Sequence, residues 1–256
     1  MKSLIYIQYL WKFVQFVAKP EKTIFAVNNN TMLTIGHRGA KGHVTENTLA
    51  SFAKALELGA QGIELDVHVC ASGELVVFHD VTVDRLTNGT GEVAKFTLTE
   101  LKALEVTGGY SIPTLNEVLD LVNKKCLVNI ELKGSHTAQP VNNTIEKYIA
   151  ESGWAYADFI VSSFQYEELK AMSEINPNVP LGVLTETSLQ QAWEWADAFN
   201  AVALHPHYTL LTESNVAKAH QAGYKIYTFT VNKPADIAHI KALGVDGIIT
   251  DFPDRI

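Results

Sequence analysis

The chain has 256 residues, of which 47% are hydrophobic and 19% are charged, and its net charge is −8 at pH 7. Such a composition and length suit one large globular domain with an ample hydrophobic core. The acidic balance argues against a nucleic-acid-binding protein, and two cysteines provide no disulfide framework.

The first segment, residues 1–31, is rich in large apolar and aromatic side chains and has no acidic residue before Glu21. Polar residues interrupt its apolar runs, which are too short to span a membrane. Three interpretations stay open: a signal peptide, an amphipathic helix through which residues 1–20 contact a membrane surface weakly, and a helix at 4–17 that packs on the domain. We favour the packed helix, and we expect a cytoplasmic protein whose membrane contact, if residues 1–20 make one, is peripheral at the inner face.

From Met32 onward, short apolar runs alternate with longer stretches in which apolar residues recur with helical spacing. In "NTLASFAKALELGA", for example, Leu49, Phe52 and Leu56 lie on one face of a helix. Strands separated by helices in this way predict an α/β fold, a (β/α)8 TIM barrel formed by residues 32–256. The expected strands cover 33–37, 62–69, 127–132, 159–164, 180–185, 201–205, 225–231 and 246–250.

A doubly wound open sheet is the alternative fold, but no glycine-rich dinucleotide fingerprint follows the first expected strand. The sequence ends shortly after the eighth expected strand, which would leave a barrel without its last outer helix. We expect the N-terminal helical extension, at 4–17, to fill the apolar groove between strands eight and one.

The strand "GIELDVHV" carries Glu64 and Asp66 two residues apart, so both carboxylates lie on the same face. Glu131 lies at the end of the next barrel strand and is expected to point the same way. Unpaired carboxylates in one place raise each other's pKa, and a hard cation such as Mg²⁺ or Ca²⁺ removes that repulsion. Salt bridges to Arg38 and Lys133 are the alternative explanation.

Two histidines are expected to converge on these carboxylates. His37 ends the first strand, and His79 ends a further extended run, "GELVVFHD", which should fold back beside the second strand after a turn. An imidazole titrates near neutral pH, so the two histidines suit an acid/base pair, while Arg38 and Lys133 supply the charge that holds a phosphate. Together with a cation, this set predicts the cleavage of a phosphodiester.

Six segments in order resemble the glycerophosphodiester phosphodiesterases, from about Ile35 to Asp254: "GHRGAKGHVTENTLASFAKALELGAQGIELDV", "GELVVFHD", "IPTLNEVL", "NIELK", "TFTVN" and "GVDGIITDFP". The resemblance implies a barrel that hydrolyses small-molecule diesters, such as glycerophosphocholine or glycerophosphoethanolamine, to glycerol 3-phosphate and an alcohol. It implies Glu64, Asp66 and Glu131 as ligands of Mg²⁺ or Ca²⁺, His37 and His79 as the acid/base pair, and Arg38, Lys133, Glu46 and Phe229 as substrate-binding residues.

The sequence departs from the family pattern at a few positions. Thr45 stands where proline is usual, Phe229 stands where Trp or Tyr is common, and "CASG" replaces a Thr-x-Asp-Gly turn, which leaves Cys70 unexplained. The short insertion after strand two, residues 81–112, corresponds to the segment that caps the site in this family. It has no apolar excess, and its small size suits small water-soluble head groups better than a deep lipid tunnel. Alternatives are a lysophospholipase D acting on lysophospholipids at a membrane surface, a phosphoinositide-specific lyase, and a barrel that binds glycerol phosphates without turnover.

Overall fold

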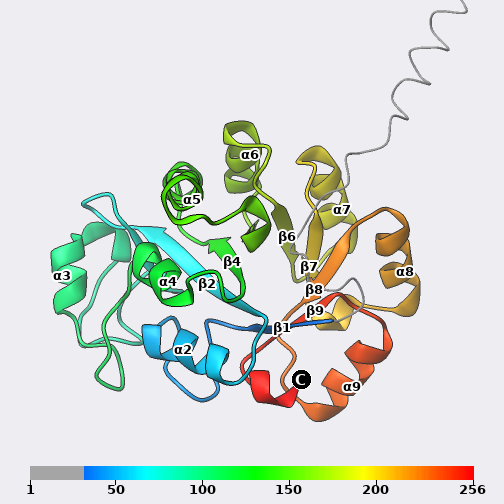
Figure 1. The fold of residues 1–256 in the computed structure, drawn as a ribbon, viewed down its shortest axis with the longest axis horizontal. Coiled ribbons are helices and arrows are strands. Elements are labelled where there is room, and N and C mark those ends of the chain that lie inside the picture. The colour runs from blue at the N-terminus through cyan, green and yellow to red at the C-terminus, as the bar shows by residue number, and fades with distance from the viewer. Residues whose placement is uncertain (1–31) are drawn as a thin grey trace, which may run out of the picture.

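The structure, a computed structural model, describes residues 32–256, whose parallel strands close into a barrel (Figure 1). The strand order is β1-β9-β8-β7-β6-β5-β4-β2, and β1 also pairs with β2, which closes the circle. The predicted (β/α)8 barrel is therefore confirmed, and the open sheet is wrong. The parallel strands are β1 Leu33–Gly36, β2 Gly62–Val69, β4 Leu127–Leu132, β5 Phe159–Ser163, β6 Leu181–Thr185, β7 Ala203–Pro206, β8 Lys225–Thr228 and β9 Gly247–Thr250.

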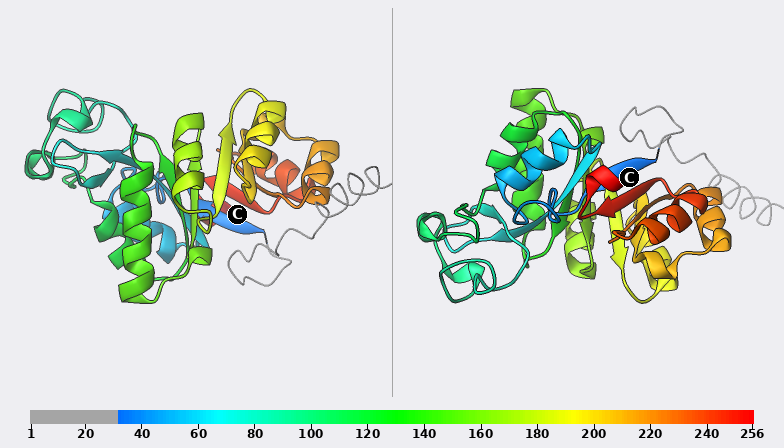
Figure 2. Two further views of the ribbon diagram at one scale, coloured as in Figure 1. Left: turned by 90° about the horizontal axis from the view of Figure 1, so that it is seen from above. Right: turned by 90° about the horizontal axis from the view of Figure 1, so that it is seen from below.

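Helices surround the barrel and cover the outer faces of its strands (Figures 1 and 2). Threonine starts several of them: the hydroxyls of Thr48, Thr114 and Thr212 accept the backbone N–H three residues on, which is a typical N-cap. Their apolar faces are buried against the strands. The surrounding helices are α2 Leu49–Glu57, α4 Leu115–Val122, α5 Ala138–Ser152, α6 Tyr166–Ile175, α7 Leu189–Ala198, α8 Glu213–Gln221 and α9 Pro234–Ala242.

The alternation of side chains along each strand separates two cores. On β2, Ile63, Leu65 and Val67 point outward and are fully buried under the helices, whereas Glu64 and Asp66 point into the barrel. A smaller apolar cluster lies in the barrel interior. Its residues are Leu33, Ile35, Leu127, Ile160, Val202, Ala203, Tyr227 and Ile249.

The run that was expected to fold back beside the second strand does so. β3, Leu75–Val77, pairs antiparallel with β2 and places Val77 opposite Val67. The following segment, 81–112, contains a short 3₁₀ helix, Val93–Lys95, and α3, Leu98–Ala103, which lies at the outer edge of the molecule (Figure 1). Its small core also contains Cys70, so the sulfur that the sequence left unexplained serves packing.

Two sequence predictions fall on residues 1–31 and lie outside the described residues: the packed helix at 4–17 and the membrane contact of residues 1–20. Within residues 32–256, no helix has both the length and the apolar character that crossing a bilayer requires. The cytoplasmic location and the division of the chain at residue 32 stay predictions.

A buried carboxylate on α6 caps the start of α5 just after β4. Glu168 accepts hydrogen bonds from the backbone N–H groups of His136, Thr137 and Ala138, at 2.5, 3.0 and 3.0 Å. The N-terminus of a helix has unpaired backbone N–H groups and a partial positive charge. The Glu168 carboxylate accepts hydrogen bonds from the N–H groups and offsets the charge. The contact also fixes the loop that follows Lys133.

We expect Glu168→Ala to lower the free energy of unfolding by about 2–4 kcal/mol, because it leaves the buried donors of Thr137 and Ala138 without a partner. Urea denaturation measures this loss. The matched control is Glu167→Ala, on the exposed side of the same helix turn, which should stay within about 0.5 kcal/mol of the wild type. Equal stability of the two variants would contradict the capping role.

Candidate active site

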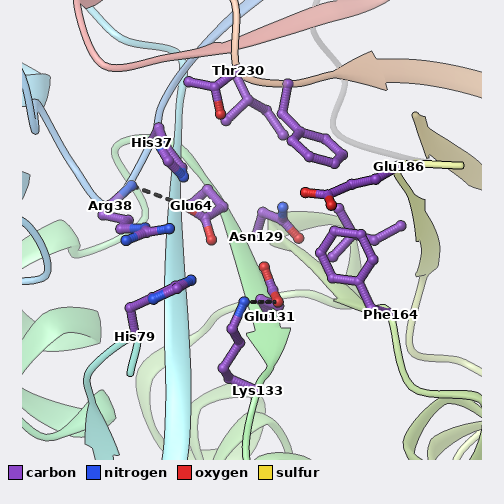
Figure 3. A pocket seen from close by; sticks show the side chains of 13 residues that line it. His37, Arg38, Glu64, His79, Asn129, Glu131, Lys133, Phe164, Glu186 and Thr230 are labelled. Carbon is purple, nitrogen blue, oxygen red and sulfur yellow. Dashed lines mark hydrogen bonds and ion pairs between the residues drawn. The ribbon is translucent and has the colours of Figure 1, made fainter. Parts of the chain in front are cut away.

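A pocket of about 500 Å³, counting the open solvent at its mouth, lies at the C-terminal ends of the barrel strands (Figure 3). This is the end at which barrels of this kind carry their chemistry. Most residues that the sequence singled out line it, whereas Glu46 and Asp66 lie behind the lining. The lining residues are His37, Arg38, Glu64, His79, Asn129, Glu131, Lys133, Phe164, Leu184, Glu186, Phe229, Thr230 and Ile249.

The three predicted metal-binding carboxylates converge at the wall of this pocket. β2 and β4 are neighbours, with Asp66 opposite Glu131, and one oxygen each from Glu64, Asp66 and Glu131 lies within 4.8 Å of the other two. All three side chains are buried. Burial, reinforced by their mutual repulsion, raises the pKa of Glu64 well above its usual value and that of Glu131 to about 7.

Two cations only partly neutralise these carboxylates. The backbone N–H of Arg38 donates to Glu64 Oε2 at 2.8 Å, and its Nε lies 3.4 Å from Asp66 Oδ2. Lys133 Nζ donates to Glu131 Oε1 at 2.9 Å but lies 3.8 Å from Asp66 Oδ1, which has no hydrogen-bond partner. The salt bridges of the alternative explanation are thus present, yet they leave a buried acceptor unpaired. Oxygen donors in this arrangement fit a hard divalent cation.

Arg38 is held in place from two sides. Its backbone adopts the left-handed region, with φ of 50°, which an arginine adopts only where the surroundings impose it. Its Nη1 donates to Glu46 Oε1 at 2.7 Å. Glu46 is buried and does not line the pocket. Although burial opposes ionisation, hydrogen bonds from Arg85 and Arg38 hold its pKa at about 2. We therefore interpret Glu46 as a residue that orients Arg38, not as a direct contact with substrate.

Each histidine of the predicted pair is oriented by an aspartate. His37 Nδ1 lies 2.6 Å from Asp251 Oδ1, and Asn232 Nδ2 donates to the other oxygen of Asp251 at 2.7 Å. His79 Nδ1 lies 2.6 Å from Asp80 Oδ1. An ionised carboxylate only accepts hydrogen bonds, so the proton of each neutral imidazole resides on Nδ1 and Nε2 is left as an acceptor.

The electrostatic surroundings keep both imidazoles neutral at pH 7. Burial lowers the pKa of His37 and of His79 below 6.5, and the aspartates beside them offset only part of that effect. A hydrogen bond from Arg85 keeps the pKa of Asp80 below its usual range, so Asp80 is ionised. Both histidines line the same pocket as Glu64 and Glu131, as the sequence predicted.

The sequence analysis did not assign three residues that contact the candidate site: Asp80, Asp251 and Arg85. Asp80 directly follows His79 in "FHD" and Asp251 directly follows the eighth barrel strand, so their positions were the available signal. Arg85 joins Asp80, through its Nε at 2.6 Å, to Glu46, through Nη2 at 2.7 Å. Among the described residues, segment 81–112 reaches the site through Arg85 and adds no residue to the lining, so its capping role stays a prediction.

Two phenylalanine rings form one wall of the pocket. Phe229, expected as an aromatic wall, lies edge to face with Phe164, with ring centroids 5.8 Å apart and an interplanar angle of 87°. Lys133 Nζ lies 5.6 Å from the centre of the Phe164 ring. The pocket therefore has a charged side with the histidines and a side formed by two rings at a right angle.

Comparison with known proteins agrees with this geometry. The sequence model of the glycerophosphoryl diester phosphodiesterase family matches residues 37–255. A glycerophosphodiester phosphodiesterase of Caldanaerobacter subterraneus subsp. tengcongensis is 40% identical over 233 residues, and the match covers 88% of this chain and 96% of that protein. One of Bacillus altitudinis is 38% identical over 235 residues, with 86% and 94% covered.

A solved structure gives the same result for the fold. The phosphodiesterase of Oleispira antarctica, in complex with the product sn-glycerol-3-phosphate, has a TM-score of 0.80 to this chain. The two are 28% identical, and the match covers 88% of this chain and 94% of the other. The chain described here thus belongs to the glycerophosphoryl diester phosphodiesterase family, as the ordered segments of its sequence predicted.

Proposed function

We propose that this phosphodiesterase uses a divalent cation to hydrolyse glycerophosphodiesters to glycerol 3-phosphate and an alcohol. The observation that carries the proposal is the convergence of Glu64, Asp66 and Glu131 beside two histidines that are each oriented by an aspartate. The product named for the Oleispira antarctica structure supports the choice of glycerol 3-phosphate.

The charged side of the pocket is suited to the phosphodiester. Glu64, Asp66 and Glu131 would hold Mg²⁺ or Ca²⁺, which when bound offsets the negative charge of the nonbridging phosphate oxygens. Arg38 and Lys133 flank these carboxylates and present N–H donors to the same region. The phosphodiester carries a single negative charge, so a few cationic groups bind it well.

The two imidazoles account for the proton transfers. A neutral imidazole accepts a proton at Nε2 from the attacking hydroxyl as its oxygen bonds to phosphorus. If that hydroxyl is water, glycerol 3-phosphate forms directly. If it is the neighbouring hydroxyl of the glycerol group, a cyclic phosphate forms first, and a water then attacks phosphorus and breaks one P–O bond of the ring to give glycerol 3-phosphate. The other imidazole, whose pKa the bound phosphodiester anion raises, donates a proton from Nε2 to the leaving alkoxide as the phosphorus–oxygen bond breaks. The aspartates on Nδ1 stabilise the imidazolium that each transfer requires.

The test is an assay of the purified protein with glycerophosphocholine, and with lysophosphatidylcholine in parallel, with the products identified by mass spectrometry. We expect glycerol 3-phosphate and choline from the first substrate, at a much higher kcat/KM than turnover of the second. Release of phosphocholine and glycerol, or turnover of the lysolipid alone, would overturn the proposal. Accumulation of a cyclic phosphate would instead indicate a lyase.

A further inference from the structure

His68 is a buried histidine beside the active site that has no part in the chemistry described so far. It lies on β2, two residues after Asp66, and it is 5% exposed. Its Nε2 lies 3.2 Å from the carbonyl oxygen of His79. A carbonyl oxygen only accepts hydrogen bonds, so Nε2 of His68 carries the proton and donates it.

This hydrogen bond supplies a partner that the sheet does not. β3 pairs with β2 as far as Val77, and the backbone N–H of Phe78 donates to the carbonyl of Asp66 at 3.0 Å. The chain then leaves the strand, and no backbone N–H group within residues 32–256 donates to the carbonyl of His79. The imidazole of His68 therefore holds the peptide group that joins His79 to the next residue.

The ring of His68 also packs against the loop that follows β4. A Cβ atom at Gly134 would lie 2.9 Å from His68 Nδ1 and 3.2 Å from its Cα, which is too close without a shift of the ring or of β2. The loop is held in place, because the backbone N–H groups of Lys133 and Gly134 both donate to the carbonyl of Val67, at 3.3 and 3.0 Å. Glycine at 134 thus leaves the space that the imidazole of His68 needs.

We propose that His68 is a positioning residue for His79: it fixes the peptide group between His79 and Asp80, and so keeps the His79 imidazole directed into the pocket. The inference rests on the proposed function, in which His79 transfers a proton. His79 Nδ1 lies 2.6 Å from Asp80 Oδ1, so the two side chains of this contact extend from either end of that one peptide group. A rotation of the peptide group would redirect both and displace Nε2 of His79, and small displacements of a reacting group lower a rate strongly.

The experiment measures kcat and KM for glycerophosphocholine in variants of similar size. His68→Leu removes the donor and should lower kcat by about tenfold or more while KM stays within about twofold, because Arg38 and Lys133 still contact the phosphate. His68→Gln keeps an N–H donor near the position of Nε2 and should restore most of the wild-type kcat. The matched control is His239→Leu, exposed on α9, which should change neither constant.

Measurement of Tm establishes that each variant is folded at the assay temperature. If His68→Leu is not, His68→Asn replaces it, since its shorter side chain is polar but does not reach the carbonyl. Equal kcat values for His68→Gln and the variant without the donor would overturn the proposal.

Combination with His79→Ala separates positioning from a general loss of structure. Without an imidazole at residue 79 there is nothing to direct, so His68→Leu should change the residual rate of His79→Ala by less than about twofold. An equal fall in both backgrounds would show that His68 only stabilises the fold, which contradicts the proposal. Gly134→Ala gives a second test: it should lower kcat in the wild type and much less in His68→Ala, which has no ring to displace.

The outcomes separate this inference from the function on which it rests. If the wild type does not release glycerol 3-phosphate, or if His79→Ala does so at the wild-type rate, the proposed function or the role of His79 in it fails. If His79→Ala loses activity while His68→Leu keeps the wild-type kcat, the proposed function stands and His68 is not a positioning residue.

Discussion

Treatment with EDTA is expected to abolish hydrolysis of glycerophosphocholine, with a fall in kcat of about 10²-fold or more, and addition of Mg²⁺ or Ca²⁺ should restore it. The reason is the arrangement of Glu64, Asp66 and Glu131, whose oxygens meet within 4.8 Å while Asp66 Oδ1 lacks a hydrogen-bond partner. Arg38 and Lys133 alone do not neutralise the negative charge of the three carboxylates. Initial rates in chelated and reconstituted protein measure the effect.

The same prediction has a readout that does not depend on turnover. In the cation-free protein the pKa of Glu131 is raised to about 7 from 4.5, and that of Glu64 is raised as well. The folded state therefore binds more protons than the unfolded state, and stability falls as pH rises from about 4.5 through 7. Added cation should recover this loss, so the increase in Tm with Mg²⁺ or Ca²⁺ should be larger at pH 8 than at pH 5.

Variants provide the control for this cation dependence. Glu131→Gln removes one proposed ligand and should lose both activity and the increase in Tm, whereas Glu151→Gln, exposed on α5, should keep both. Full activity in EDTA, together with a Tm that neither cation changes at pH 8, would remove the cation from the mechanism.

Replacing either histidine of the proposed acid/base pair should have the second large effect. His37→Ala and His79→Ala are each expected to lower kcat by about 10²–10⁴-fold, because one proton transfer loses its donor or acceptor. Both side chains are partly exposed, so the folded state should survive the change, as measured by Tm. A rate like that of the wild type from either variant would overturn the assignment of that residue.

The control is a histidine in a similar pair outside the pocket. His220 Nε2 lies 2.8 Å from Asp246 Oδ2, yet neither residue lines the site, so His220→Ala should leave kcat close to that of the wild type. The pH profile gives a further check. Burial lowers the pKa of His37 and His79, so the fall of kcat/KM on the acid side should lie at a lower pH than an unperturbed imidazole would give, as the proposed base becomes protonated.

Most of the fold could be predicted because a barrel strand and an amphipathic helix impose different periods on the sequence. The expected strand at 62–69 has the bounds of β2, and the alternation of Glu64 and Asp66 with Ile63 and Leu65 identified its two faces. The expected strand at 225–231 was too long. β8 ends at Thr228. Beyond it an isolated bridge joins Phe229 to His207 and the backbone N–H of Val231 donates to the carbonyl of Ile249, although the apolar pattern continues.

The candidate site was predictable where its residues lie at the ends of strands, since the order of the strands brings those ends together. The partners of these residues were not. Asp251 lies 214 residues from His37, and no local pattern indicates that their side chains meet. Arg85 lies in the segment expected to cap the pocket, yet its guanidinium joins Glu46 to Asp80 behind the lining.

The sequence by itself determined the family and the barrel and indicated the candidate residues at the strand ends, because these depend on periodicity and on an ordered set of segments. Only the tertiary structure decided which aspartate orients which imidazole, that Glu46 supports Arg38 from behind, and that Glu186 faces the pocket beside two phenylalanine rings. The reason is physical: such contacts depend on side-chain directions and on the closure of the sheet from β9 to β1, which local sequence patterns do not specify.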